Sequence, residues 1–139
     1  MNYSSILLNP LHWFLGILLY SCAPQSQPKG QIDHANVATV VELLDQNENA
    51  VVLDVRTPEE FTAGHIEGAI NINIYDDDFP EKVAKLDRDK TYVVHCAANV
   101  ENGRSAKSLD IMDGLGFTSL ISMDGGFAAW QQDSLPLAK

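Results

Sequence analysis

Short apolar segments that alternate with amphipathic segments are the feature that most limits how this chain can fold. AVVLDV at 50–55 is a continuous apolar run of the kind that is buried in a parallel sheet, and AININ at 69–73 alternates as a strand does. TYVVHC at 91–96 and SLISM at 119–123 are two further strand candidates. Strands that are separated by helices imply a parallel sheet with right-handed crossovers.

Helical patterns fill the segments between these strand candidates. In TPEEF, Thr57 is the expected N-cap, Pro58 the first helical residue and Glu60 the partner that closes a capping box, and this short helix should stop at Gly64. The other helix candidates are 36–44, 78–86, 105–116 and 125–132. The chain of 139 residues therefore predicts one α/β domain, a parallel sheet with helices on both faces.

The first segment, MNYSSILLNPLHWFLGILLYSC, contains no Lys, Arg, Asp or Glu. Its apolar run at 11–20 is too short for an ordinary membrane-spanning helix but suits the core of a signal peptide. Ser21 before Cys22 resembles the lipobox of bacterial lipoproteins, in which the cysteine receives the lipid and becomes the new N-terminus. We therefore expect 1–21 to be a lipoprotein signal peptide that is cleaved before Cys22, and 22–30 to be a flexible tether.

These segments predict an exported protein of a bacterial cell envelope, lipid-anchored through Cys22 and facing the periplasm or the exterior. An uncleaved membrane anchor and ordinary signal cleavage nearby are the alternatives. Every charged residue lies from Lys29 onward, so the formal net charge of −10 falls on the exported part. Such an acidic surface argues against nucleic acid as a partner and against electrostatic binding to anionic lipid.

Cys96 is the candidate catalytic nucleophile. If Cys22 is lipidated, Cys96 is the only thiol left, so no intramolecular disulfide can form. It ends the predicted strand at 91–95 and precedes a loop and a helix, and ligands of parallel sheets bind beyond the carboxyl ends of the strands. Successive backbone N–H groups and a helix N-terminus would favour the thiolate and an oxyanion beside it.

Two groups of motifs resemble a known family, the rhodanese domains. VVLDVRTPEEFTAGHIEGAINI at 51–72 resembles their first half, with Asp-x-Arg, Glu-Glu-Phe/Tyr and Gly-His-Ile-x-Gly-Ala. GRSAKSLDIMDGLGFTSLISMDGGFAAW at 103–130 resembles their second half, with Arg-Ser-Ala, Leu-Gly-Phe and Gly-Gly-x-x-Ala-Trp. The resemblance implies a single rhodanese-like domain at 31–139, with a five-stranded parallel sheet and a cysteine that forms a persulfide.

The resemblance also implies a thiosulfate-type sulfurtransferase. Such a protein moves sulfane sulfur from a small anionic donor, through a Cys96 persulfide, to an external thiol or cyanide acceptor. Because the mature chain has no second thiol, the acceptor must be another molecule, and a protein acceptor is an alternative to a small one. We expect a monomer that needs no cofactor, and the four scattered histidines make no metal site.

The loop after Cys96 departs from the pattern of the family. Family sulfurtransferases usually have four residues between the cysteine and an arginine, and related phosphatases and arsenate reductases have five, whereas this chain has seven, AANVENG. A dianionic donor would be repelled if the acid of this loop pointed inward, so sulfur transfer from such a donor requires this acid to face solvent, which a long loop permits. The predicted substrate-binding residues are Ala97, Ala98, Asn99, Val100, Glu101, Asn102, Gly103 and Arg104.

Particular properties of the loop suit a cradle for an anion. Ala97, Ala98 and Gly103 are small enough for the backbone to approach a ligand closely, while Asn99, Asn102 and Gly103 tolerate left-handed dihedral angles. Arg104 could add a planar fork of donors for a sulfonate or phosphate-like group.

Three further residues are expected to support the site. Asp54 and Arg56 end a strand near the same edge, where Arg56 could pair with Glu60, and Ser105 is the expected cap of the helix after the loop. Two other functions stay open. His95-Cys96 favours a phosphatase or arsenate reductase on the same fold, although His95 should point to the opposite face of its strand. A tethered binding module without turnover is the third reading.

Overall fold

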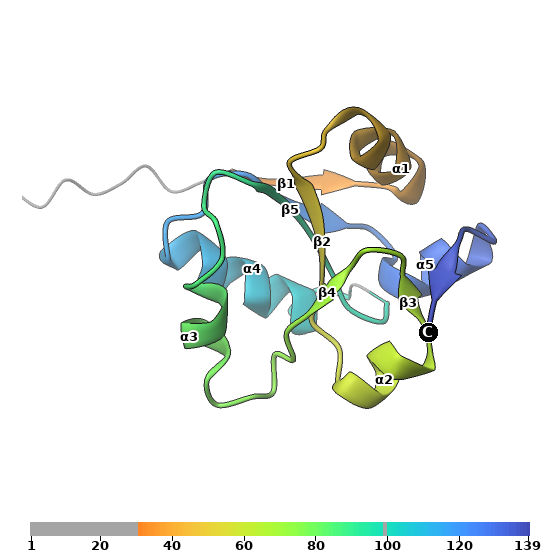
Figure 1. The fold of residues 1–139 in the computed structure, drawn as a ribbon. Helices are drawn as coiled ribbons and strands as arrows, with labels where there is room; N and C mark the ends of the chain where they lie inside the picture. Colours follow the sequence, from red (N-terminus) through yellow and green to blue (C-terminus); the bar gives the residue numbers. More distant parts are fainter. Residues whose placement is uncertain (1–30, 99) are drawn as a thin grey trace, which may run out of the picture.

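Five parallel strands form the centre of the structure, a computed structural model that describes residues 31–98 and 100–139 (Figure 1). The strands are β1 (Ile32–Ala35), β2 (Ala50–Asp54), β4 (Ile70–Asn71), β5 (Thr91–His95) and β6 (Leu120–Met123). Their order across the sheet is β1-β6-β5-β2-β4, with every neighbouring pair parallel. The expected five-stranded parallel sheet is confirmed, and β5 lies in its middle.

Several predictions fall outside the described residues. They are the signal peptide at 1–21, the lipidation of Cys22, the tether at 22–30 and the role of Asn99. Across 31–98 and 100–139, every helix is too short or too polar to cross a membrane.

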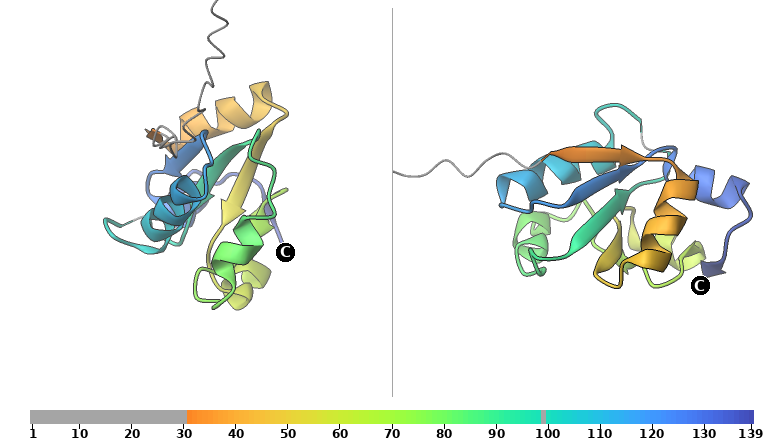
Figure 2. Two further views of the ribbon diagram at one scale, coloured as in Figure 1. Left: turned by 90° about the vertical axis from the view of Figure 1, so that its left-hand side faces the viewer. Right: turned by 90° about the horizontal axis from the view of Figure 1, so that it is seen from above.

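Helices cover both faces of the sheet, as expected. The helices are α1 (Val37–Gln46), α2 (Pro58–Ala63), α3 (Phe79–Val83), α4 (Arg104–Gly114) and α5 (Gly126–Gln132). Residues of α3 and α4 pack in one apolar layer, and residues of α1 and α5 pack in the other (Figures 1 and 2). The sheet therefore has two separate cores, one on each side.

The alternation of side chains along β5 decides which core receives the candidate nucleophile. Tyr92, Val94 and Cys96 pack in the α3/α4 layer, whereas Val93 packs in the α1/α5 layer. His95 is also fully buried, and its ring stacks near that of Phe127 in α5 with 6.2 Å between the centroids. Cys96 and His95 therefore face opposite sides of the sheet, as the period of a strand requires.

The short helix α2 has the ends that the sequence predicts. Thr57 accepts a hydrogen bond from the Glu60 backbone N–H at 3.3 Å, and the Glu60 carboxylate accepts one from the Thr57 backbone N–H at 3.1 Å. These two bonds form the predicted capping box, and the helix ends with Gly64 as its C-cap. The helix fixes the position of Glu60 within a few residues of the end of β2.

Three strands differ from the sequence-based expectation. The edge strand β1 was not predicted, because IDHA has only two apolar residues and no continuous apolar run (Figure 2). The strands β3 (His65–Ile66) and β7 (Leu137–Ala138) pair antiparallel in a separate two-stranded sheet. Two residues are too few to show a period of two, so the sequence carries no sign of this pair.

Candidate active site

Cys96 follows the last residue of β5 directly and lies where that strand meets α4. The residue is 4% exposed and belongs to the apolar layer that includes Leu109 of α4. Its Sγ atom also lies 3.4 Å from the hydroxyl Oγ of Ser105, in the first turn of α4. The sulfur is therefore held between the core and a helix start, where backbone N–H groups favour negative charge.

The structure corrects the role predicted for Ser105. Helix α4 starts at Arg104 with Gly103 as its N-cap, so Ser105 lies inside the helix and does not cap it. Its fully buried hydroxyl faces the sulfur of Cys96 instead. The helix starts two residues earlier than expected, and a turn in the loop leads directly into it.

That turn forms the second half of the loop, residues 100–103. The Gly103 N–H donates to the Val100 carbonyl at 2.9 Å, and Asn102 has a left-handed φ of 55°. The bond from the fourth residue to the first and a positive φ at the third are features of a type II turn. Asn102 thus confirms one predicted left-handed position. Gly103 does not, since its φ is −75°. It is needed for space, because a Cβ atom there would lie 2.7 Å from the Val100 carbonyl oxygen.

The first part of the loop is attached to α5. The Phe127 N–H donates to the Cys96 carbonyl at 2.9 Å, and the Ala128 N–H donates to the Ala97 carbonyl at 2.8 Å. Ala97 is half-buried, while Ala98 and Val100 are exposed. The backbone at Cys96 is thereby fixed by a helix that follows it by thirty residues in the sequence.

Arg104 makes a bidentate ion pair with Glu60. Its Nη1 lies 2.5 Å from Glu60 Oε2, and its Nη2 lies 3.0 Å from Oε1. The hydrogen bond from Arg104 is the main cause that lowers the pKa of Glu60 to about 2, with a further contribution from the Thr57 N–H. The pKa of Arg104 is raised, chiefly by Glu60 and in smaller part by attraction to Cys96. The predicted anion-binding fork is therefore occupied by a carboxylate of the same chain.

The expected pairing of Arg56 with Glu60 is wrong. Arg56 donates to Asp54 through both Nε and Nη2, with Nη2 2.6 Å from Asp54 Oδ2, and its guanidinium lies 3.8 Å from the centroid of the Phe127 ring. Asp54 is two residues away and completely buried, and a buried carboxylate needs a cation as its partner. Arg56 therefore pairs with Asp54 and not with Glu60 on the next helix. The Arg56 Nη2 also donates to the Gly64 carbonyl at 2.9 Å, so the pair joins the end of β2 to the end of α2.

His95 has the structural role that the sequence favours. Its Nδ1 lies 3.1 Å from the Cys96 carbonyl oxygen, and its Nε2 has no hydrogen-bond partner among the described residues. Burial lowers the pKa of His95, although attraction to Asp54 opposes this effect. Because the ring lies on the opposite face of the sheet from the sulfur, it does not form a proton-transfer pair with Cys96.

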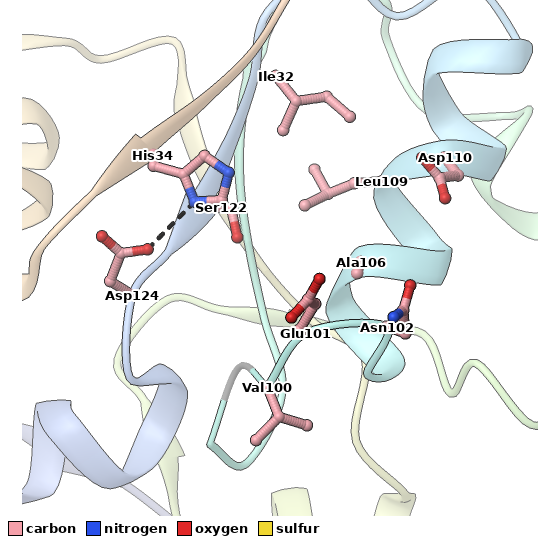
Figure 3. A pocket seen from close by; sticks show the side chains of 10 residues that line it. All are labelled: Ile32, His34, Val100, Glu101, Asn102, Ala106, Leu109, Asp110, Ser122 and Asp124. Atoms are coloured by element: carbon pink, nitrogen blue, oxygen red, sulfur yellow. Dashed lines mark hydrogen bonds and ion pairs between the residues drawn. The ribbon is translucent and has the colours of Figure 1, made fainter.

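A cavity of about 410 Å³ opens beside the loop, where it is lined by Leu109 and Ile32 (Figure 3). These two residues belong to the same apolar layer as Cys96, although Cys96 itself is not among the lining residues. Glu101 is exposed and lines this cavity together with Asp110 of α4, so it faces solvent. At the far wall, His34 pairs with Asp124 at 3.2 Å. The lining residues are Ile32, His34, Val100, Glu101, Asn102, Ala106, Leu109, Asp110, Ser122 and Asp124.

A second hollow lies on the other side of the loop and was not predicted. It is lined by Ile74, Tyr75, Asn102, Gly103, Arg104, Lys107 and Ile111. Tyr75 is 67% exposed, and its ring centroid lies 5.9 Å from the guanidinium carbon of Arg104. In the sequence, Tyr75 stands beside acidic residues just before a predicted helix, which is a common pattern at a helix N-terminus. The sequence therefore offered no sign that Tyr75, Lys107 or the partner Glu60 belongs to the site.

The fold and this site define an α/β protein that presents a cysteine, a candidate nucleophile, at the carboxyl end of the middle strand, where parallel sheets commonly bind their ligands. Residues 36–133 match the family model described as the rhodanese-like domain, and the chain belongs to that family.

Similar proteins agree with this membership. YtwF of Bacillus subtilis (strain 168) is 32% identical over 106 residues, which cover 76% of this chain and 97% of that protein. The thiosulfate sulfurtransferase GlpE of Shewanella oneidensis is 29% identical over 99 residues, which cover 71% and 92%. A crystal structure of a rhodanese-related protein from Thermoplasma volcanium has a TM-score of 0.65 and 33% identity, and covers 76% and 97%. These relatives support a sulfurtransferase in general.

Proposed function

We propose that Cys96 carries sulfur between a donor and an acceptor as a persulfide. The Cys96 thiolate attacks the outer sulfur of the donor, so a new S–S bond forms while the S–S bond of the donor breaks. The rest of the donor leaves with the electron pair of the broken bond. For thiosulfate, this leaving group is sulfite. An acceptor thiolate or cyanide then attacks the terminal sulfur, and Cys96 leaves as the thiolate. The product is an acceptor persulfide or thiocyanate.

The position of the Cys96 sulfur is the observation that carries this proposal. The sulfur lies at the carboxyl end of the middle strand, 3.4 Å from the Ser105 hydroxyl and within the influence of the Arg104 charge. A helix start and a nearby cation both favour a thiolate, which is the nucleophilic form. Cys96 is also the only cysteine within 31–98 and 100–139, so the group that accepts the sulfur lies outside this part of the chain.

Thiosulfate and polysulfide are the donors to try first. The name of the Shewanella relative includes thiosulfate, which makes this dianion a candidate for the present chain. The reduced protein is treated with each donor, desalted and measured by intact mass spectrometry. We expect one added sulfur atom, which is lost when cyanide or a small thiol is added.

The Cys96→Ser variant should gain no sulfur, and a Ser108→Ala variant serves as the control. Ser108 is a buried residue of the same helix whose hydroxyl donates to the Arg104 carbonyl at 2.8 Å. Absence of added sulfur on the wild-type chain with both donors would end the proposal.

We also propose that the chain is exported and anchored by a lipid on Cys22. The uncharged leader and the Ser21-Cys22 junction support this proposal. The anchored domain would then act on sulfur compounds outside the cytoplasm.

A further inference from the structure

We infer that the site selects organic sulfane-sulfur donors that carry at most one negative charge, and that it discriminates against the thiosulfate dianion. This inference rests on the proposed function, because it names the donor class for the Cys96 persulfide. Three independent features carry it: the ion pair of Arg104, the position of Glu101 and the apolar part of the cavity beside the loop.

The first feature is that the fork of Arg104 is already filled. Both Nη atoms of Arg104 contact the carboxylate of Glu60, at 2.5 and 3.0 Å. With a pKa of about 2, Glu60 stays ionised at every pH at which a thiol is an effective nucleophile. A dianion that enters must compete with a built-in carboxylate for these donors, so the arginine contributes little attraction to a second negative charge.

The second feature is an excess of carboxylates around the loop. Glu101 and Asp110 border the cavity, and Asp124 lies at its far wall beside His34 (Figure 3). On the other side of the loop, Lys107 borders the second hollow. Nearby, Asp54 and Arg56 neutralise each other. The formally charged groups that line these two hollows are the acids Glu101, Asp110 and Asp124 and the cations Arg104 and Lys107. A third hollow beside Ala97 is lined by Glu60 together with Arg56 and Lys139, and there Glu60 pairs with Arg104 and Arg56 pairs with Asp54.

The third feature is an exposed apolar surface, which only a donor with an organic group can bury. Val100 is 61% exposed at the tip of the loop, although it is a large aliphatic residue. In the cavity it is joined by Ile32 and by Leu109 of α4, which also packs in the same core layer as Cys96 (Figure 3). A cavity of about 410 Å³ is within the usual range for small organic ligands, which bury apolar surface there.

Thiosulfonates have the chemistry that these features favour. A thiosulfonate, R–SO₂–S⁻, carries one negative charge and an organic group. When the Cys96 thiolate attacks its outer sulfur, the S–S bond of the donor breaks, and the sulfinate R–SO₂⁻ leaves with the electron pair. The step therefore parallels that of thiosulfate, from which methanethiosulfonate differs by a methyl group in place of one charged oxygen.

This pair of donors allows a direct test. Initial rates of Cys96 persulfidation are measured by mass spectrometry with thiosulfate, methanethiosulfonate and benzenethiosulfonate at low ionic strength. Each rate is divided by the rate of the same donor with free cysteine, which removes differences in intrinsic reactivity. We expect the normalised rate to be at least about tenfold higher for methanethiosulfonate than for thiosulfate, and higher again for benzenethiosulfonate.

Variants that each remove one carboxylate charge show which residue disfavours thiosulfate. Glu60→Gln and Glu101→Gln should each raise the rate with thiosulfate, relative to methanethiosulfonate, by roughly three- to tenfold, the size of one charge interaction that is partly screened by solvent. Val100→Ser should reduce the advantage of benzenethiosulfonate over methanethiosulfonate. The matched control is Glu48→Gln, which removes an exposed carboxylate just before β2, at the opposite end of the sheet, and should leave all ratios unchanged.

The outcomes separate this inference from the proposed function. If none of the donors adds sulfur to the wild-type chain, the proposed function fails. If all three add sulfur at equal normalised rates, or if thiosulfate is the fastest, only the donor inference fails. A change of the ratios in Glu48→Gln as large as in Glu101→Gln would also overturn it, because the discrimination would then come from overall charge.

Discussion

His95 is a buried titratable side chain on the reverse side of the strand that carries Cys96. Its Nε2 lies 3.8 Å from Asp54 Oδ2 without a hydrogen-bond partner in the described part of the chain, and burial lowers its pKa below the ordinary 6.5. The folded protein therefore keeps this ring neutral in a range where the unfolded chain binds a proton. The contribution of His95 to the free energy of unfolding is therefore fully present above pH 6.5, the pKa in the unfolded chain. It decreases as the pH falls below that value.

We expect the wild-type protein to lose up to about 1 kcal/mol of unfolding free energy from His95 alone between pH 7.5 and 5.5. Urea unfolding at the two pH values measures this loss, and His95→Gln, which cannot titrate, gives the reference. The quantity compared is the change with pH, because the substitution itself also alters packing. An equal change with pH in both proteins would show that His95 becomes protonated in the folded state.

The turn at 100–103 and helix α4 act as one structural element. A Cβ atom at Gly103 would lie 2.7 Å from the backbone oxygen and 3.0 Å from Cγ2 of Val100, so Gly103→Ala must displace the turn. We expect this variant to lower the rate of Cys96 persulfidation at least about tenfold, because placement errors near 1 Å are costly at a reacting group. Intact mass spectrometry after a short exposure to donor measures the rate.

Gly114 at the other end of α4 provides the matched substitution. A Cβ atom there meets nothing within 4 Å. Gly114→Ala should leave the persulfidation rate unchanged and raise the unfolding free energy by about 0.5–1 kcal/mol, since alanine is the better helix residue. A fall in rate with both variants would mean that the helix, not the turn, sets the reactivity of the sulfur.

These elements differ in how far the sequence predicts them. The strands β2 and β5 and the capping box of α2 were predictable, because apolar runs and capping residues act over a few positions. The pair between Glu60 and Arg104 was not, since 44 residues separate them and the sequence offered Arg56 as a nearer partner. The turn at 100–103 was likewise not predictable, although an asparagine such as Asn102 tolerates the left-handed φ that the turn requires.

For the whole molecule, lipid attachment at Cys22 predicts where the protein is found. Expressed in a bacterium with a clickable fatty acid, the chain should carry the label and sediment with membranes. Cys22→Ala should lose both properties, because no other residue of the leader can accept the lipid in this way. Cys96→Ala is the control and should keep both. Unchanged labelling of Cys22→Ala would contradict the anchor.

The site itself depends on the complete fold. Glu60 comes from α2, Cys96 from the end of β5 and Arg104 from the start of α4, while α5 fixes the backbone of the nucleophile through its first N–H groups. Elements distant in the sequence thus meet only after the sheet has formed. Loss of the sheet should therefore remove the reactivity proposed for Cys96 together with the tertiary structure.

The burial of Cys96 has a consequence for how the protein is produced. With the residue only 4% exposed, two native molecules cannot easily bring their sulfurs together. An unfolded chain has no such shield, and oxidation can then crosslink it to a neighbour before α4 packs against β5. Refolding yield should therefore fall with protein concentration in air and recover with a reductant, whereas the native protein should tolerate storage without one.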